Sequence, residues 1–284
     1  MKVFISADME GVSGITHPAQ CRPTHADYGR FRDLFTEEVN AAVEGAIEGG
    51  ATAVVVNDAH FTMTNILIEK LHPAAELISG STKLLGQMEG LDESFDAVFF
   101  VGYHEGDGMG DGIVNHTLMS ATLRRVRIDG VEVDEAGLNG RVAAALGVPV
   151  ALLTGDDVVC AQAERDFPGI AVAPVKRAID RLTGQHLVPE TACGLIRERA
   201  AAALDGLPRL RAADVPAADE PVRLELEFRS TSAAHCCTLF PGVVRTSPSA
   251  VTIEHRSFLD AFRHFWGLAI LGMAVQDGVF GTGF

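Results

Sequence analysis

The chain has 284 residues and a formal net charge of −15 at pH 7, with 23 Lys plus Arg against 38 Asp plus Glu. This balance argues against nucleic-acid binding, because a protein that displaces counterions from phosphates needs a basic surface. Hydrophobic residues make up 47% of the chain and charged residues 21%, which is typical of a folded globular protein. We therefore expect one domain, or one domain with a smaller appended part.

The start of the chain does not resemble an export signal, because its short apolar run is interrupted by Asp8. The apolar stretch 265–275 is shorter than the roughly 20 residues that span a bilayer, so it is predicted to be a buried helix rather than a membrane anchor. The five cysteines are Cys21, Cys160, Cys193, Cys236 and Cys237. Their odd number and the lack of C-x-x-C spacing predict reduced thiols and a cytoplasmic location.

Short apolar runs alternate with helical patterns through the first part of the chain. The predicted strands are 2–7, 51–56, 97–101 and 148–153, and the predicted helices are 35–47, 135–146, 156–166 and 189–204. Between them, Asp129-Gly130 predicts a tight turn in a hairpin over 123–133. The alternation of strands and helices indicates an α/β fold with a mostly parallel central sheet flanked by helices.

The segment 207–221 has the composition of a connector, with three prolines among alanines and aspartates. Beyond it, residues 222–228 alternate between apolar and polar, which predicts a half-exposed strand that pairs with 251–254. We therefore predict an α/β metal-binding catalytic core over 1–206. A smaller α+β part over 222–284 would pack on this core or complete it.

Two carboxylates follow the first predicted strand. Asp8 and Glu10 are two residues apart, so in an extended segment they project to the same side. Two anions held together need a proton or a cation between them. On these two residues alone, an exposed acidic strand end remains the alternative.

Histidines follow the next two predicted strands. His60 comes shortly after 51–56, and His104 after 97–101. Because ligand sites of open parallel sheets lie outside the carboxyl ends of the strands, we expect both histidines to meet Asp8 and Glu10 at one edge. The convergence favours a metal site over solvated loop histidines. Asn57 and Asp58 would then orient the ring of His60 without binding the metal themselves.

Two further residues have open roles. Glu135 begins a predicted helix, where it is either a fifth ligand or a complement to the helix dipole. His116 follows the glycine-rich segment 106–112, a mobile loop or a surface turn, and is a ligand, a proton carrier or a loop histidine. Two imidazoles and three carboxylates suit zinc or a neighbouring transition metal. Five ligands exceed the need of one catalytic zinc, so two ions sharing a carboxylate is the economical interpretation.

Several motifs together resemble the DppA-type D-aminopeptidases, a family of dinuclear zinc peptidases. They are the segments 6–14, 56–60, 71–80, 102–104, 115–116 and 135–139. The resemblance covers nearly the whole chain, with weaker detail after about residue 205. The sequence departs from this pattern in two places. It has Asn115 where a serine precedes the histidine in a family member, and it contains the glycine-rich segment 106–112.

The resemblance implies a site and an assembly. The resemblance implies that Asp8 bridges two zinc ions and that His116 is the catalytic residue. The other ligands that it implies are Glu10, His60, His104 and Glu135. It also implies a ring-shaped, decamer-like homo-oligomer with its sites facing an internal chamber.

The sequence thus predicts a metal-dependent aminopeptidase that removes the N-terminal residue from short peptides or amino-acid amides. The preference for D-residues is implied by the resemblance alone. Neither nucleic acid nor membrane is expected as a partner. The alternatives are a dinuclear metallo-esterase or phosphoesterase, since the same metals assist all three hydrolyses, and a non-catalytic metal-binding or ligand-sensing protein.

Overall fold

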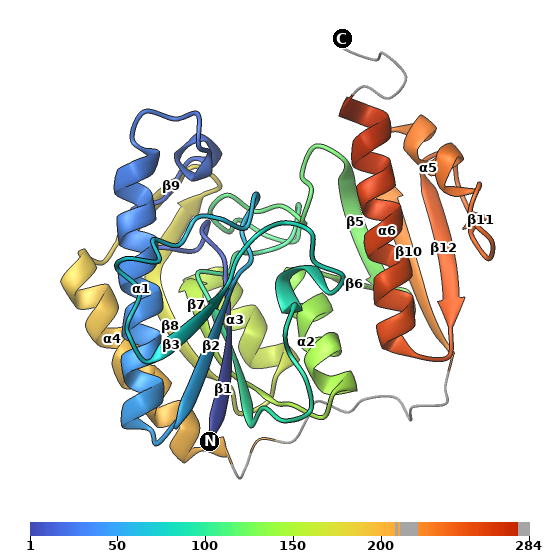
Figure 1. Ribbon diagram of the computed structural model, residues 1–284. Helices are drawn as coiled ribbons and strands as arrows, with labels where there is room; N and C mark the ends of the chain where they lie inside the picture. The colour runs from blue at the N-terminus through green and yellow to red at the C-terminus, as the bar shows by residue number, and fades with distance from the viewer. Residues whose placement is uncertain (208–209, 211–220, 278–284) are drawn as a thin grey trace.

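The computed structural model, shown in Figure 1, describes residues 1–207, 210 and 221–277. Its larger sheet is built from strands Lys2–Ala7 (β1), Ala53–Asp58 (β2), Ala75–Ile78 (β3), Ala97–Val101 (β4), Val150–Asp156 (β7), Ala171–Asp180 (β8) and Thr183–His186 (β9). Their order is β3-β2-β1-β4-β7-β8-β9. All neighbours are parallel except β8 and β9, which are antiparallel. The predicted α/β class with a mostly parallel sheet is confirmed.

Helices cover both faces of this sheet, which is why its central strand, β4, is apolar on every residue. The helices are Tyr28–Glu48 (α1), Glu135–Ala145 (α2), Asp157–Asp166 (α3) and Pro189–Asp205 (α4). Val3 and Ile5 of β1 pack in the cluster that includes α1 and α4, whereas Phe4 belongs to the cluster on the other face with α2 and α3. Figure 1 shows α1 beside α4 on one side and α2 beside α3 on the other.

The smaller sheet is antiparallel and draws on two distant parts of the chain. Its strands are Leu123–Ile128 (β5), Val131–Val133 (β6), Val222–Phe228 (β10), Val244–Arg245 (β11) and Ala250–His255 (β12), in the order β11-β12-β10-β5-β6. The β5–β6 turn has Asp129 at φ 50° and Gly130 at φ 86°, which confirms the predicted tight turn.

The division of the chain into 1–206 and 222–284 stays a prediction, but the smaller sheet joins segments from both ranges. β10 pairs with β5, so the hairpin predicted in the first range extends the C-terminal sheet. The expected connector lies almost wholly outside the described residues. One cluster of buried side chains runs from Phe100 of β4 to Leu224 of β10. The two sheets therefore share a core.

The smaller sheet is covered by helices Thr231–Cys237 (α5) and Phe258–Asp277 (α6). By length and composition α6 could cross a membrane, yet half of the segment Phe258–Val275 is buried inside the protein. Phe262 and Phe265 are at most 1% exposed and belong to the shared core. The helix predicted over 265–275 is present and packs on the sheet, but it is buried on one face only, since Ile270 is 43% and Met273 37% exposed.

Candidate metal centre

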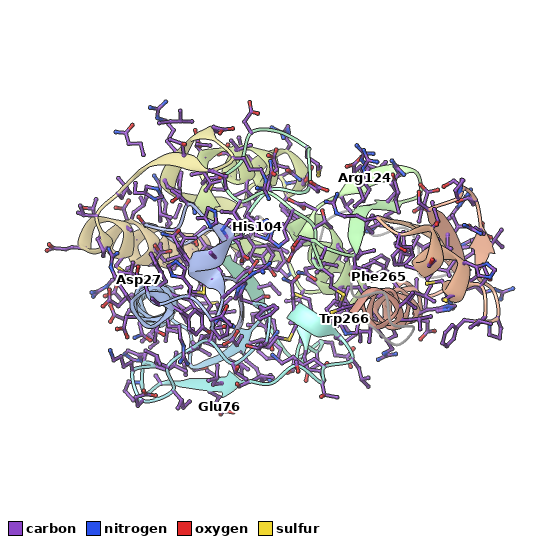
Figure 2. All side chains as sticks on the ribbon, turned by 90° about the horizontal axis from the view of Figure 1, so that it is seen from above. Asp27, Glu76, His104, Arg124, Phe265 and Trp266 are labelled. Carbon is purple, nitrogen blue, oxygen red and sulfur yellow. The ribbon has the colours of Figure 1, made fainter. Side chains whose placement is uncertain are left out.

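The carboxyl ends of β1, β2 and β4 lie side by side and deliver the predicted residues to one edge of the sheet. Ala7 is in register with Asp58 on one side and with Val101 on the other. In Figure 1 these strands run upward, and Figure 2 looks down on their ends. There His104 lies in the part built on the parallel sheet, away from Arg124 and Phe265 of the other part.

The turn after β1 packs directly on the turn after β4. The Gly11 N–H donates to Gly102 O at 2.7 Å, and a Cβ atom on Gly11 would lie 2.0 Å from Tyr103 O. Gly102 itself has φ +72°, a conformation that favours glycine. Both glycines are therefore needed for the close approach that brings Glu10 beside the loop of His104.

His60 faces two carboxylates through one ring nitrogen. Its Nδ1 lies 3.2 Å from Asp8 Oδ1 and 2.8 Å from Glu10 Oε2. Its other nitrogen, Nε2, lies 2.9 Å from Cys21 O. Because a carbonyl only accepts, Nε2 carries the proton, and the lone pair of Nδ1 points at the carboxylates.

His104 faces a second pair of carboxylates in the same way. Its Nε2 lies 3.3 Å from Asp8 Oδ2 and 3.3 Å from Glu135 Oε1. Its Nδ1 lies 2.9 Å from Glu105 O, which places the proton on Nδ1 and leaves Nε2 free to bind a cation. Asp8 thus stands between two imidazoles, with one carboxylate oxygen toward each.

The residues present fit a metal centre. The five side chains are at most 7% exposed. Although it is close to His60, Glu10 Oε2 has no hydrogen-bond partner, and neither has His104 Nε2. Buried polar atoms without partners are costly. A cation between these atoms would satisfy both of them, and imidazoles with carboxylates form the donor set that zinc prefers.

The electrostatics favour positive charge at this point. Burial lowers the pKa of His60, but the charges of Glu10 and Asp8 outweigh it and hold this pKa well above its usual value. For the carboxyl group of Asp8, burial acts in the opposite direction and raises the pKa. Hydrogen bonds and charge from His104 and His60 outweigh it and hold this pKa below its usual range. The field that favours a proton here also favours a metal cation.

His116 lies beside His104, and one of its ring nitrogens is close enough to His104 and Glu135 to join them around an ion. Its ring stacks on His104 with the centroids 4.2 Å apart, and its Nε2 is 4.0 Å from Glu10 Oε1. Its Nδ1 lies 2.9 Å from Val114 O, which orients the ring. The side chain is 14% exposed, against 1% for His104. His116 is therefore the histidine of the centre that is most accessible to a substrate.

The family model for Peptidase M55, described as D-aminopeptidase, matches residues 1–266. The chain belongs to this family of D-aminopeptidases. It is 35% identical over 274 residues to the D-aminopeptidase of Bacillus subtilis (strain 168), covering 96% of this chain and 98% of that protein. It is also similar to the solved structure of the Zn-dependent D-aminopeptidase DppA from Bacillus subtilis, a self-compartmentalizing protease, with a TM-score of 0.91 and 34% identity. That match covers 96% of this chain and 98% of DppA.

The resemblance predicted from the sequence is confirmed, and with it the prediction of a peptidase that acts on D-amino-acid peptides. In this D-aminopeptidase the structure brings all six predicted site residues together: Asp8, Glu10, His60, His104, His116 and Glu135. Glu135 lies beside His104 although it also begins a helix. Which of the six bind metal remains a prediction.

Two supporting residues have roles that the sequence did not show. Cys21 holds His60 through its carbonyl, and its Sγ is close enough to Glu10 and His60 to join them around an ion. Burial raises the pKa of this thiol well above its usual value. Gln87 donates to Glu135 Oε2 at 2.5 Å. Neither Cys21 nor Gln87 follows a predicted strand, so no local pattern indicated them.

Asn57 and Asp58 shape backbone rather than the ring of His60. Asp58 Oδ2 accepts the N–H groups of Asn65 at 2.5 Å and Ile66 at 2.8 Å, and so closes the loop after β2. Asn57 Nδ2 donates to Gln87 O at 2.6 Å. They order the loop that carries His60, while the ring itself is oriented by the carbonyl of Cys21.

The glycine-rich segment of this D-aminopeptidase is held at several points. Asp107 forms an ion pair with Arg229 of the other part of the molecule. The Gly112 N–H donates to Glu105 Oε2 at 2.9 Å. Asn115 donates to Gly110 O at 2.8 Å and accepts from Arg181 Nε at 2.9 Å, so its side chain ties this segment to the β8–β9 hairpin.

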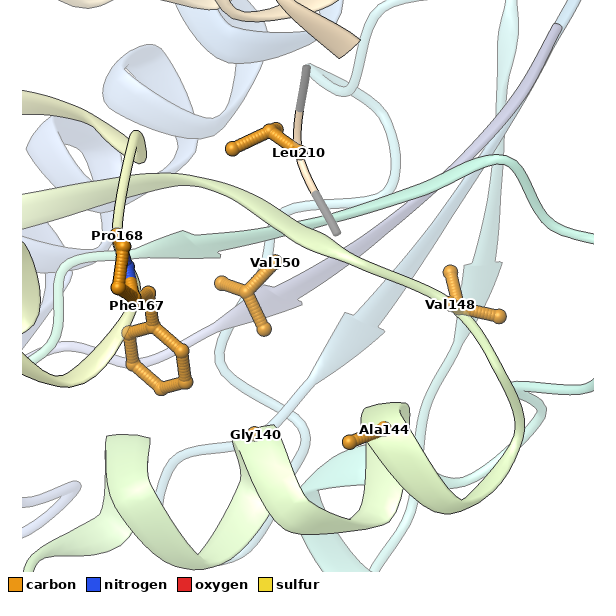
Figure 3. Close-up of a pocket in the computed structure, with 7 residues that line it drawn as sticks. All are labelled: Gly140, Ala144, Val148, Val150, Phe167, Pro168 and Leu210. Carbon is orange, nitrogen blue, oxygen red and sulfur yellow. The ribbon is translucent and has the colours of Figure 1, made fainter. Parts of the chain in front are cut away.

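A small pocket lies elsewhere, between α2 and the start of β7 (Figure 3). It is lined by apolar residues such as Val148, Val150 and Phe167. Val150 is the first residue of β7, so this pocket is at the amino end of the parallel strands. The candidate metal centre is at the opposite end, and the pocket has no group that could take part in its chemistry.

Proposed function

We propose that this D-aminopeptidase binds two zinc ions that share Asp8. Glu10 and His60 would complete the ligands of one ion, and His104 and Glu135 those of the other. The observation that carries the proposal is the position of Asp8, whose two carboxylate oxygens face two different imidazoles at 3.2 and 3.3 Å. A carboxylate in this position supports a bridge between two ions, as in other two-metal hydrolases.

Zinc in such a centre supplies a polarised substrate carbonyl and water with a pKa lowered toward about 7. The chain's own residues would do the rest. His116 Nε2, beside Glu10, is placed to pass a proton to the nitrogen of the leaving amine, because the ring is oriented by Val114 O and is partly accessible. The products are the released N-terminal amino acid and the shortened peptide or ammonia.

The test combines metal analysis with a substrate screen. Zinc is measured per chain after reconstitution and dialysis, and we expect a value close to two. Turnover is measured on paired D- and L-alanyl dipeptides and amides, with an alanine ester and an aryl phosphate as the alternative substrates. Faster hydrolysis of D-configured amide bonds supports the proposal. A protein that binds no zinc, or that cleaves only the ester or the phosphate, would contradict it.

We also propose that copies of this chain assemble into a ring, as the self-compartmentalizing character of DppA suggests. Exposed apolar side chains between the end of α5 and β11 support this proposal: Leu239 is 80% exposed, Val244 61% and Phe240 47%. Large apolar side chains exposed close together in the chain are candidates for an interaction surface. The cytoplasmic location expected from the sequence stays a prediction.

Light scattering on Leu239→Glu tests the assembly. We expect the variant to have a smaller mass than the wild type, while Val131→Glu, at an apolar residue of β6 that is 67% exposed, keeps the wild-type mass. A wild-type protein that is monomeric at micromolar concentration would contradict the ring. An unchanged mass for Leu239→Glu would place the contact elsewhere.

A further inference from the structure

A buried lysine lies behind the turn that carries Glu10. Lys176, in β8, is 3% exposed. Its Nζ donates to Glu10 O at 2.5 Å, to Ile15 O at 2.8 Å and to Val12 O at 3.1 Å. All three proton donors of the ammonium group are thus directed at carbonyls of one turn, and one of these carbonyls belongs to Glu10 itself.

Other side chains hold the N–H groups of the same turn. The Ser13 N–H donates to Glu38 Oε1 of α1 at 2.8 Å, and the Gly14 N–H donates to His186 Nδ1 of β9 at 2.9 Å. Residues 10–15 lack regular secondary structure, so their backbone groups need such partners. Lys176 provides the largest share of these contacts, because it fixes three carbonyls at once.

A second buried lysine serves the loop of His60 in the same way. Lys83 is 5% exposed, and its Nζ donates to Asp58 O at 2.6 Å and to Asn57 Oδ1 at 2.7 Å. It reaches a third acceptor, Ile78 O, at 3.4 Å. Asp58 is two residues before His60, so this ammonium group fixes the point at which the chain leaves β2.

The other half of the centre is held by neutral hydrogen-bonding groups. Glu135 accepts from Gln87 Nε2 at 2.5 Å and from the Leu118 N–H at 2.6 Å, while the His104 ring is oriented by Glu105 O. The contacts described for Glu135 and His104 include no lysine. Within the described residues, the two ammonium groups therefore directly contact only the Glu10 and His60 half. Lys83 reaches the other half indirectly, through Asn57, whose Nδ2 donates to Gln87 O.

Two lysines buried beside the same half of the metal centre need an explanation. An ammonium group is costly to bury, and burial lowers the pKa of both Lys176 and Lys83 to about 8. A methionine would fill similar space without that cost. What a methionine cannot do is bind several backbone carbonyls at one point, and these carbonyls belong to the turns that present Glu10 and His60.

We infer that Lys176 and Lys83 are positioning residues for the zinc ion proposed between Asp8, Glu10 and His60. Each fixes the backbone beside one ligand, so that the Glu10 carboxylate and His60 Nδ1 meet at a fixed distance. The inference rests on the proposed function. It predicts that the two ions respond differently to loss of a lysine, which a general contribution to folding does not.

The experiment measures zinc affinity in Lys176→Met and Lys83→Met by competition with a chelating dye. For each variant we expect one ion to bind about 10- to 100-fold more weakly, the usual effect of losing an outer partner of a metal ligand, and the other to bind as in the wild type. Gln87→Met is the matched control in the other half. Gln87→Met should weaken the ion proposed at His104 and Glu135 and leave the ion at Glu10 and His60 unchanged.

Double variants identify the ion that is weakened. Glu10→Gln removes a ligand of the first ion, so adding Lys176→Met to it should change zinc binding little further. In Glu135→Gln the second ion is already weakened, and adding Lys176→Met should then weaken both. Non-additivity in the first pair and additivity in the second would place the lysine and Glu10 at the same ion.

Thermal unfolding in the presence of a chelator separates positioning from folding. We expect the metal-free Lys→Met variants to unfold cooperatively, and added zinc to raise their unfolding temperature less than that of the wild type. Loss of both ions in parallel, or a chain that does not fold without metal, would overturn the inference, as would unchanged zinc affinity in both variants. A wild-type protein that binds no zinc would overturn the proposed function and this inference with it.

Discussion

The parallel and antiparallel sheets place their charged side chains in opposite ways. At the carboxyl ends of the parallel strands, Asp8 and Lys176 are at most 3% exposed and are surrounded by polar partners. On the antiparallel sheet, Arg127 of β5 pairs with Glu225 of β10, and these side chains are 27% and 25% exposed. One sheet thus buries charge at its end, whereas the other carries charge along its open face.

The difference matters because the two kinds of charge have different energetic consequences. A buried ionised group is costly unless it is fully paired, and it persists where it has a task. An ion pair near the surface contributes about 0 to 1 kcal/mol to the free energy of unfolding. Removing a buried charge at the carboxyl ends of the parallel strands should therefore change activity. Removing a charge from the exposed face of the antiparallel sheet should change activity and stability little.

The largest effect is expected for Asp8→Asn. The amide keeps the shape of the side chain but removes the negative charge that faces both His60 and His104. We expect both zinc ions to be lost and turnover to fall below detection, with far-ultraviolet circular dichroism unchanged. Zinc analysis and a D-alanyl amide assay on one preparation check this. Activity near the wild-type level would mean that Asp8 is only a strand terminus.

His116→Ala should separate proton transfer from metal binding. His116 stacks on His104, but it lies 4.0 Å from Glu10 and is more exposed than the proposed ligand histidines. We expect both ions to remain and turnover to fall by about 10² to 10⁴, the usual contribution of a positioned acid or base. His104→Ala is the comparison, and it should lose zinc first. A His116→Ala protein without zinc would show that this histidine is a ligand.

The sequence was most informative where chemistry follows a strand. Asp8, His60 and His104 could be predicted as neighbours because parallel strands end at one edge of a sheet. Lys176 and Lys83 could not, because a lysine is typical of an exposed surface. Their role depends on carbonyls that are far away in the chain, and no local pattern records that.

Strand ends and edge strands were predicted less well for a related reason. The apolar pattern ended two strands at residues 56 and 153, but β2 continues to Asp58 and β7 to Asp156. These aspartates are buried because they bind backbone N–H groups, so polarity did not mark the end of the strand. The edge strands β3 and β9 were missed because both are short and partly exposed. β8, next to β9, was missed because it contains proline and charged residues.

Glu38→Gln gives a smaller effect that depends on pH. Burial raises the pKa of Glu38 from 4.5 to about 7, and the N–H of Ser13 and the charge of Lys176 offset this only in part. The folded protein therefore holds this proton more tightly than the unfolded chain, so the free energy of unfolding falls as pH rises between 4.5 and about 7. Glutamine removes this contribution.

Denaturant unfolding of both proteins at several pH values measures the effect. The stability of Glu38→Gln relative to the wild type should rise with pH, by on the order of 3 kcal/mol between pH 4.5 and 8. Contributions from other groups cancel in the difference between the two proteins. A difference that does not change with pH would mean that Glu38 titrates in the folded protein as it does in the unfolded chain, and that the buried end of the parallel sheet tolerates its charge.

The smallest effect is expected on the antiparallel sheet, for Arg127→Gln. Arg127 is ion-paired with Glu225 and lies 3.7 Å from Glu227 and 3.9 Å from Glu132, but all four side chains are in contact with solvent. We expect at most about 1 kcal/mol of lost stability, because water solvates the charges that remain. Zinc content and turnover should match the wild type, since this face lies on the sheet that carries no proposed ligand. A loss of zinc would show that the antiparallel sheet supports the metal centre through the shared core, and the contrast between the two sheets would then fail.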